Sequence, residues 1–176
     1  MRQAAEADFR GWASAHRSGL RATAFLLSGD WHLAEDLAQD TLTRMFAVWE
    51  RVTSSGDPDA YARRVMVNLY LDHRRRPWRR EELNEVMPER TAPEAGTVEG
   101  GTRLELIAAL REVPPGQRAV LVLRFWEDLS VEQTAAALNR SCGNVKSQTS
   151  RGLVALRDAL ARRGIHELLT IAGETS

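Results

Sequence analysis

Four polar side chains between residues 144 and 151 are suited to reading the edges of DNA bases. On a helix, the spacing i, i+3, i+4 and i+7 places on one face Asn144, Ser147, Gln148 and Arg151. Amide and guanidinium groups present donors and acceptors that match base edges in the major groove. Arg140 and Lys146 lie to the sides of this face, where they are suited to hold phosphates.

A helix-turn-helix is the element that would present this face. Ser130 followed by Gln133 is a capping box that starts a first helix. Apolar residues at 131, 135 and 138 predict one buried face, and residues 139–141 make the turn. The alternative is a plain two-helix hairpin with a solvated polar face, because short helical hairpins are common.

Charge is segregated along the chain although the formal net charge is zero. Residues 63–80 hold seven arginines against one acid, and residues 139–163 hold six basic side chains against one acid. Between them, residues 81–102 hold six glutamates against one arginine. Two basic blocks around an acidic connector are expected if two separate surfaces meet phosphate.

Composition excludes several other classes of protein. No apolar run approaches the ~20 residues of a membrane helix, and the N-terminus lacks the apolar stretch of a signal peptide, so we expect a cytoplasmic protein without membrane insertion. The single cysteine, Cys142, excludes an internal disulfide, and the four scattered histidines predict no metal site. The sequence implies no cofactor.

Helical spacing recurs throughout the chain, which predicts an all-α protein of two small helical domains joined by a flexible acidic linker. The first domain spans residues 1–76, with helices ending near Gly29, beginning at Asp30 and running from about Ala60 to Arg76. Gly19 is a possible bend, and residues 53–58 read as a loop. A Pro-, Gly- and Glu-rich linker (77–102) precedes the helix-turn-helix domain (103–163) and a tail (164–176).

A second polar stripe lies on the predicted helix that follows Asp30. Opposite its apolar residues it carries Asp36, Gln39, Asp40 and Arg44. Such a stripe on its own is usually just a solvated face.

Three segments together resemble one protein family. AEDLAQDTLTRMF (34–46) resembles a polymerase-clamp-binding helix, YARRVMVNLYLDHRR (61–75) a promoter-melting helix, and the segment 110–152 a domain that reads the minus-35 element. In this order they resemble bacterial sigma-70 transcription initiation factors of the extracytoplasmic-function group, of actinobacterial type. The resemblance covers roughly residues 9–162.

The resemblance implies an alternative sigma factor, which is not an enzyme. It would bind core RNA polymerase through the polar stripe at 36–44 and through the flap, read promoter DNA and trap a flipped minus-10 base; an anti-sigma factor is a further candidate partner. The implied minus-10 residues are Val52, Arg63, Arg64, Asn68, Asp72, Arg74, Arg75 and Arg76, with Asn68 at the floor of a base pocket formed by residues 52–59. The implied minus-35 residues are those of the recognition helix, namely Arg140, Asn144, Lys146, Ser147, Gln148 and Arg151.

Some positions depart from the common family pattern. Tyr61 stands where Trp is usual, Val52 where an aromatic residue is frequent, and Pro58 interrupts the loop. Asn144 and Gln148 replace the usual Thr and Arg, so a different minus-35 preference is expected.

Two other classes of function compete with this prediction. A two-component DNA-binding regulator, which needs no core polymerase to bind its site, has a similar helix-turn-helix. Its N-terminal half would have to be an α/β receiver, and residues 1–76 lack apolar strand runs. An enzyme is disfavoured because the sequence has no phosphate loop, metal-ligand cluster or nucleophile-base pair at suitable spacing.

Overall fold

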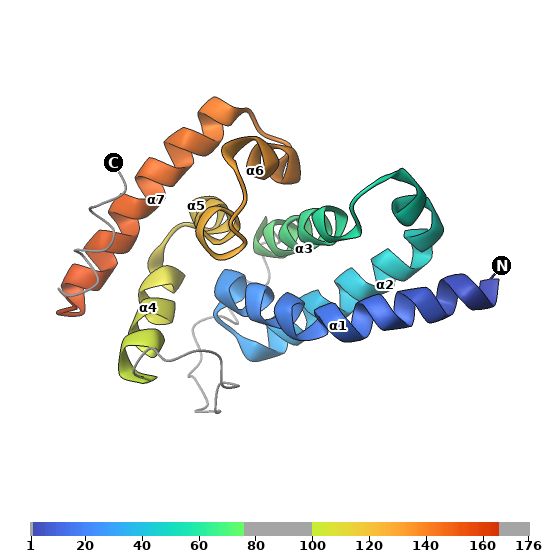
Figure 1. The fold of residues 1–176 in the computed structure, drawn as a ribbon. Helices are drawn as coiled ribbons and strands as arrows, with labels where there is room; N and C mark the ends of the chain where they lie inside the picture. The colour runs from blue at the N-terminus through green and yellow to red at the C-terminus, as the bar shows by residue number, and fades with distance from the viewer. Residues whose placement is uncertain (1, 76–99, 166–176) are drawn as a thin grey trace.

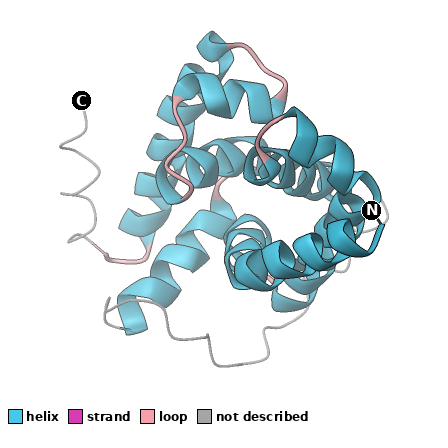
Figure 2. Cartoon of the chain, turned by 45° about the vertical axis from the view of Figure 1, so that its right-hand side comes forward, coloured by secondary structure: helices cyan, strands magenta, loops and turns pink. Residues whose placement is uncertain are grey.

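The computed structural model describes residues 2–75 and 100–165, and their regular elements are all helical (Figures 1 and 2). The first half comprises α1 (Arg2–Ser28), α2 (Trp31–Ser55) and α3 (Pro58–Arg75). The second half comprises α4 (Gly100–Glu112), α5 (Pro115–Leu121), the π-helical turn η3 (Val122–Trp126), α6 (Val131–Leu138) and α7 (Cys142–Arg162). The all-α prediction is confirmed. The α/β receiver that a two-component regulator requires is not present in residues 2–75.

Some predicted features lie outside the described residues. They are Arg76, the larger part of the linker and the end of the tail. At the edge of this gap, α4 already begins at Gly100, inside the stretch predicted as linker.

The junction between α1 and α2 follows local sequence rules. Gly29 ends α1 in a left-handed conformation (φ 70°), which favours glycine, and its N–H donates to the Phe25 carbonyl at 2.7 Å. Asp30 caps α2 as predicted, because its carboxylate accepts from the Leu33 N–H at 3.0 Å. Gly19 does not break the helix, since α1 is continuous through this residue. Buried Leu20 and the apolar residues after it hold this stretch against α2.

The turn between α2 and α3 is shorter than predicted. The helix α2 continues through residues 53–55, which were expected to form a loop, because Trp49 and Val52 are buried and keep the last turn packed against the core. Gly56 then caps α2, and its N–H donates to the Val52 carbonyl at 3.2 Å. Asp57 accepts from the Asp59 and Ala60 N–H groups at 2.9 and 3.1 Å, so it caps α3 ahead of Pro58.

The helix-turn-helix forms from the local signals of its sequence. The capping box is present: the Ser130 N–H donates to Gln133 Oε1 at 2.8 Å, and the Gln133 N–H donates to Ser130 Oγ at 3.1 Å. Asn139 ends α6 in a left-handed conformation (φ 51°), which Asn tolerates better than most residues. Ser141 caps α7 by accepting from the Asn144 N–H at 3.1 Å.

The mostly apolar segment 117–126 lies beneath the helix-turn-helix, as its lack of a polar side predicts. All residues from Arg118 to Leu123 are buried. The helix α7 approaches α5 closely at Gly152, where an added Cβ would lie 3.1 Å from Leu121 Cγ. A larger residue at this crossing would require Leu121 to shift by a few tenths of an ångström for the recognition helix to pack at this depth.

The two halves share one hydrophobic core. A continuous cluster of buried side chains runs from Leu20 in α1 to Val145 in α7. The helix α3 packs against α5 and α6, and α1 packs against α4, α5 and η3 (Figures 1 and 2). The chain therefore adopts a closed arrangement in which the second half rests on α1 and α3.

Candidate nucleic-acid interface

One face of the helix α7 is polar and exposed, and the opposite face packs against α4, α5 and α6. Asn144, Ser147 and Arg151 are exposed, and Gln148 is half-buried beside them. On the opposite side Val145 is fully buried and Leu160 nearly so. The predicted division of this helix is confirmed, although its contacts with DNA stay a prediction. Arg140 and Lys146 are also exposed, at the turn and in the first part of the helix.

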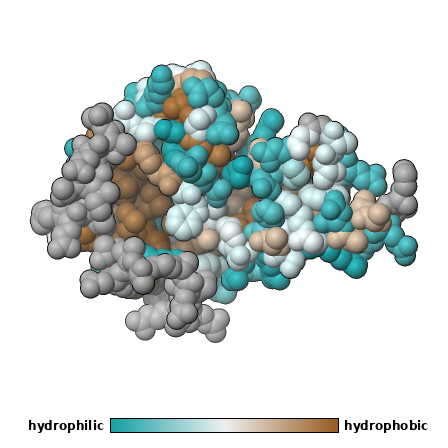
Figure 3. All heavy atoms as spheres, in the orientation of Figure 1, coloured by the Kyte–Doolittle hydropathy of each residue, from teal (hydrophilic) through white to brown (hydrophobic). Residues whose placement is uncertain are grey.

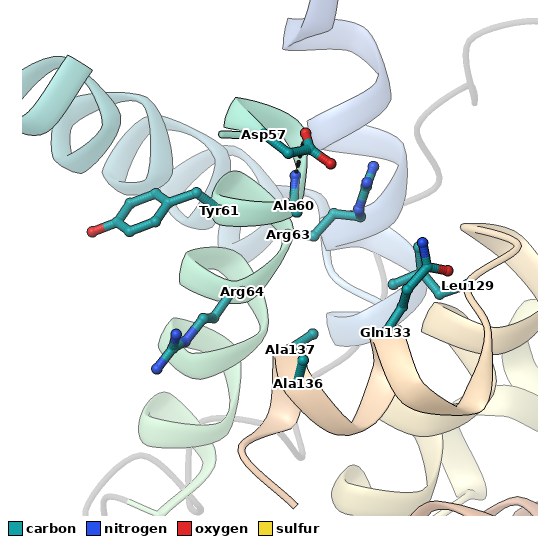
Figure 4. A pocket seen from close by; sticks show the side chains of 9 residues that line it. All are labelled: Asp57, Ala60, Tyr61, Arg63, Arg64, Leu129, Gln133, Ala136 and Ala137. Atoms are coloured by element: carbon teal, nitrogen blue, oxygen red, sulfur yellow. Dashed lines mark hydrogen bonds between the residues drawn. The ribbon is translucent and has the colours of Figure 1, made fainter. Parts of the chain in front are cut away.

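The basic residues of α3 are divided between two sides of the helix. Arg64 and Tyr61 point away from α6, whereas Arg63 points toward it (Figure 4). Only 24% of the Arg63 side chain is exposed, and its guanidinium lies 3.8 Å from a Glu127 carboxylate oxygen. The predicted minus-10 residues thus do not form one continuous surface in this arrangement.

Farther along α3, Asn68 and Arg74 are half-buried, and Asp72 and Arg75 are exposed. Asp72 lies 3.8 Å from Arg75 Nη1, in an exposed ion pair on successive turns of α3. Val52 is only 5% exposed and packs in the core of the first half. Its side chain is therefore not available to DNA here, in contrast to the prediction, because α2 extends past it.

The turn before α3 is anchored to α1. Trp12 Nε1 donates to Asp59 Oδ1 at 2.8 Å, and His16 Nε2 lies 3.3 Å from the same oxygen. The Trp12 and His16 rings stack with centroids 4.6 Å apart. These contacts hold the turn at residues 56–59 against the first helix, at the place where the sequence predicts a base pocket.

The predicted polymerase-binding stripe on α2 is exposed along its whole length. Its members are Asp36, Gln39, Asp40 and Arg44. The opposite side of α2 is buried through Leu37, Thr41 and Met45. The stripe is thus a free surface in the closed arrangement.

Family profiles match both halves of the chain: "Sigma-70 region 2" matches residues 9–80, and "Sigma-70, region 4" matches residues 103–156. The RNA polymerase sigma-E factor of Streptomyces coelicolor is 38% identical over 162 residues, which is 90% of this chain and 89% of that protein. The ECF RNA polymerase sigma factor SigE of Mycolicibacterium smegmatis is 35% identical over 153 residues, covering 84% of this chain and 59% of that protein. The chain belongs to the extracytoplasmic-function group of the sigma-70 family. It is therefore a factor for promoter-specific transcription by RNA polymerase.

A solved structure shares the fold of this sigma factor. The sigma factor RpoE of Bartonella quintana, solved in complex with the anti-sigma factor NepR, is 26% identical, with a TM-score of 0.69 over 88% of this chain and 97% of that chain. CnrH, solved with the cytosolic domain of CnrY, is 23% identical with a TM-score of 0.61, covers 91% of this chain and 94% of its own, and shows the same fold.

One buried arginine of the sigma factor was not identified from the sequence. Arg118 of α5 is only 3% exposed and has no carboxylate partner among the described residues. Its guanidinium donates to the carbonyls of Leu27 at 2.8 Å, of Val113 at 3.0 and 3.3 Å, and of Arg111. These carbonyls lie at the C-terminal ends of α1 and α4, where helix dipoles carry partial negative charge. The available signal was an arginine directly before the apolar run 119–123.

Burial shifts the titration of two neighbouring groups in this core. Desolvation lowers the pKa of the Arg118 guanidinium, although an arginine stays protonated. Burial also raises the pKa of the Tyr70 hydroxyl, against the opposing influence of the Arg118 charge. The Tyr70 hydroxyl has no hydrogen-bond partner within the described part of the chain. Arg118 is thus a structural cation between the two halves.

Glu127 is a second contact between the halves that sequence reasoning missed. It follows η3, accepts a hydrogen bond from the Thr23 hydroxyl of α1 and pairs with Arg63 of α3. Its partners are distant in sequence, so no local pattern indicates them.

No group of histidine, cysteine and acidic side chains that could hold a metal ion occurs in the described ranges 2–75 and 100–165. None of their helices is long and apolar enough to cross a membrane.

Proposed function

We propose that this sigma factor binds core RNA polymerase through α2, reads the minus-35 element with α7, and reads and melts the minus-10 element with α3. The observation that carries the proposal is the exposed polar face of α7 on a helix whose other side is buried. A helix anchored in this way can enter a major groove without losing its packing.

The side chains of α7 divide the work of binding. Gln148 and Arg151 offer the paired groups that read base edges, while Arg140 and Lys146 at the flanks hold phosphates. Ser141 fixes the start of the helix through its cap, which positions Asn144 at the first turn. The exposed face of α7 would then set the preference for a DNA sequence, and the phosphate contacts of Arg140 and Lys146 would set the position of the helix along the duplex.

Melting is assigned to α3 and the turn before it. A base that leaves the stack costs a few kcal/mol, and a pocket must return this through contacts made only to the flipped base. Asn68 offers both a donor and an acceptor for such a base, and the turn at residues 56–59 is held in place by Asp59. Arg64, Arg74 and Arg75 would hold the backbone beside it.

Two surfaces are assigned to the polymerase. The exposed stripe of α2 would meet the coiled coil of the clamp. The second half would meet the flap through α4 and α7, where Leu104 and Val154 are 59% and 53% exposed. Figure 3 shows hydrophobic atoms gathered between these two helices. An anti-sigma factor is a further partner, since RpoE of Bartonella quintana was solved in complex with the anti-sigma factor NepR.

Run-off transcription with purified core enzyme tests the proposal. The chain with core should initiate at specific promoters, whereas the chain alone should bind promoter duplex weakly because two small separate surfaces cannot fix register. A specific footprint by the chain alone, without initiation when core is added, would instead favour a polymerase-independent regulator.

Asn68→Ala separates melting from docking. The variant should bind the closed promoter complex nearly as well as the wild type but open less DNA, because the partner of Asn68 becomes accessible only after a base leaves the stack. Permanganate reactivity measures opening, and a pre-melted template should rescue the variant. Equal reactivity in both proteins would remove Asn68 from the pocket.

The assignment of α2 is tested by Asp36→Ala with Asp40→Ala. These side chains are exposed, so the double change should alter the free energy of unfolding by no more than about 0.5 kcal/mol. Affinity for core should fall in a titration. Unchanged affinity would place the clamp contact elsewhere.

A further inference from the structure

The turn between α2 and α3 has little packing of its own. Gly56 and Asp57 are exposed, and a Cβ added at Gly56 would lie in open space. Asp57 fixes the first turn of α3 by accepting from the N–H groups of Asp59 and Ala60, but this contact lies within the turn itself (Figure 4). The tip of the turn thus takes its position from the helices on either side and from contacts made to Asp59.

Asp59 connects the turn to α1. Its Oδ1 atom accepts from Trp12 Nε1 at 2.8 Å, and His16 Nε2 lies 3.3 Å from the same atom. His16 Nδ1 lies 2.8 Å from the Trp12 backbone carbonyl, which can only accept, so this nitrogen carries a proton. Asp59 is also in the first turn of α3, where the helix dipole favours a carboxylate. The carboxylate is therefore held by the start of its own helix and by two rings of α1.

Trp12 is itself fixed in an aromatic cluster. Its ring stacks on that of His16 with centroids 4.6 Å apart and lies 5.3 Å from the ring of Trp49 in α2. Trp49 is only 5% exposed, and its Nε1 donates to Asp8 Oδ2 at 3.1 Å. A donor that is packed in this way has little freedom to follow the turn if the turn moves. Asp59 is thus tied to a fixed point on α1.

The face of α3 that is proposed to meet the minus-10 element lies away from this contact. Tyr61, Arg64 and Asn68 are spaced i, i+3 and i+7, which places them on one side of the helix, and Tyr61 and Arg64 both point away from α6 (Figure 4). Asp59 precedes Asn68 by nine residues, which is about two and a half turns, so it lies on the opposite side. Trp12 therefore holds the start of α3 from behind and leaves the proposed DNA face free.

We propose that Trp12 is a positioning residue for promoter opening: through Asp59 it sets where the turn at residues 56–59 stands beside the face that carries Asn68. The inference rests on the proposed function of α3. A pocket returns the cost of an unstacked base only if it is held in the productive geometry, and a displacement of ~1 Å can cost on the order of 100-fold in rate. The helix α1, which carries none of the proposed DNA contacts, thereby takes part in selecting the minus-10 sequence.

Trp12→Phe tests the proposal, because it keeps an aromatic ring in the cluster and removes the N–H that reaches Asp59. In holoenzyme it should slow promoter opening about five- to tenfold, as for the loss of one hydrogen bond to a charged group, and flatten the base preference in a minus-10 library. Permanganate reactivity measures opening, and a pre-melted template should rescue the variant. Trp49→Phe is the matched control, since it removes the donor to Asp8 from the same cluster and should change neither measurement.

A double-mutant cycle shows whether Trp12 acts through Asp59. Asp59→Ala should have the same two effects, and adding Trp12→Phe to it should have no further effect, whereas independent roles would add. Asp59→Asn keeps an oxygen that can accept from Trp12, so it should lose less than Asp59→Ala. Urea denaturation separates positioning from stability, because both Trp variants should lose stability but only Trp12→Phe should lose opening.

The outcomes distinguish this inference from the function on which it rests. Slower opening in Asn68→Ala but not in Trp12→Phe would overturn the positioning role alone. Equal losses of opening in the two Trp variants, or additive losses in the cycle, would do the same. Opening at the wild-type rate in both Asn68→Ala and Trp12→Phe would overturn the proposed role of α3 and this inference together.

Discussion

The helices α7 and α3 carry similar side chains but differ in how they are packed. The helix α7 is anchored on one side only, by α4, α5 and α6, and its polar face is open to solvent. The helix α3 is enclosed on two sides, by α1 and α2 and by the second half, so that Arg63 is covered while Arg64 is free. A basic helix therefore offers DNA only the face that its neighbours leave open.

The largest effect is expected at Arg118 of α5, the helix against which both α3 and α7 pack. Arg118→Met removes the donors to three carbonyls between α5 and the ends of α1 and α4, and should lower the free energy of unfolding by about 2–4 kcal/mol. Urea denaturation measures this. Exposed Arg157→Met is the control and should change it by less than about 0.5 kcal/mol. Equal stability of the two variants would show that Arg118 is not structural.

On the open side of α7, substitution of a residue that reads bases should have a different effect from substitution of a residue that holds a phosphate. Gln148→Ala should cost about 1–3 kcal/mol on the preferred minus-35 sequence and flatten discrimination at one or two positions. Lys146→Ala should weaken all sequences alike and reduce the salt slope by roughly one unit. A promoter library transcribed by each holoenzyme at two salt concentrations distinguishes these outcomes. If Lys146→Ala reshapes the base preferences instead, the helix is rotated differently in the groove.

The divided faces of α3 should respond differently to the same substitution. Arg64→Ala and Arg63→Ala should each reduce the salt slope of promoter binding by holoenzyme by roughly one unit, as for one lost phosphate contact. In the free chain, only Arg63→Ala should lower the free energy of unfolding, by about 1 kcal/mol in urea denaturation, because only Arg63 is paired with Glu127. Identical behaviour of the two variants in the free chain would contradict the division of this helix.

The smallest effect is expected at an exposed ion-pair cluster that supports α7 from behind. Hydrogen bonds from Arg162 and Arg163 lower the pKa of Glu112. A carboxylate with a lowered folded-state pKa stabilises the fold above its ordinary pKa, and this contribution is lost as pH falls through the folded value. Glu112→Gln should cost at most about 1 kcal/mol at neutral pH, because the group is partly exposed. The difference from wild type should vanish in acid; a constant difference in denaturation at both pH values would exclude this cause.

The parts of the fold and of the site that could be predicted are those set by residues close together in the sequence. The caps at Asp30, Ser130 and the turn at Asn139 involve residues three to four apart, and the structure has each as expected. The exposed faces of α2 and α7 follow equally from the helical repeat. The helices continue through Gly19 and through residues 53–55 for one reason. Burial against neighbouring helices outweighs the local preference of glycine and of a polar run to interrupt a helix.

Local patterns along the chain predict most of the helices, their caps and the side of α7 that meets solvent, because hydrogen bonds and periodicity within a helix act over a few residues. The packing of the two halves, by contrast, divides α3 into two faces, and it places Glu127 beside Arg63, while Val52 is buried by the packing of the first half. Thr23 and Glu127 are 104 positions apart, and Arg118 and Leu27 are 91 apart. Contacts of that kind depend on how two apolar surfaces pack together, and no pattern within either segment encodes its partner.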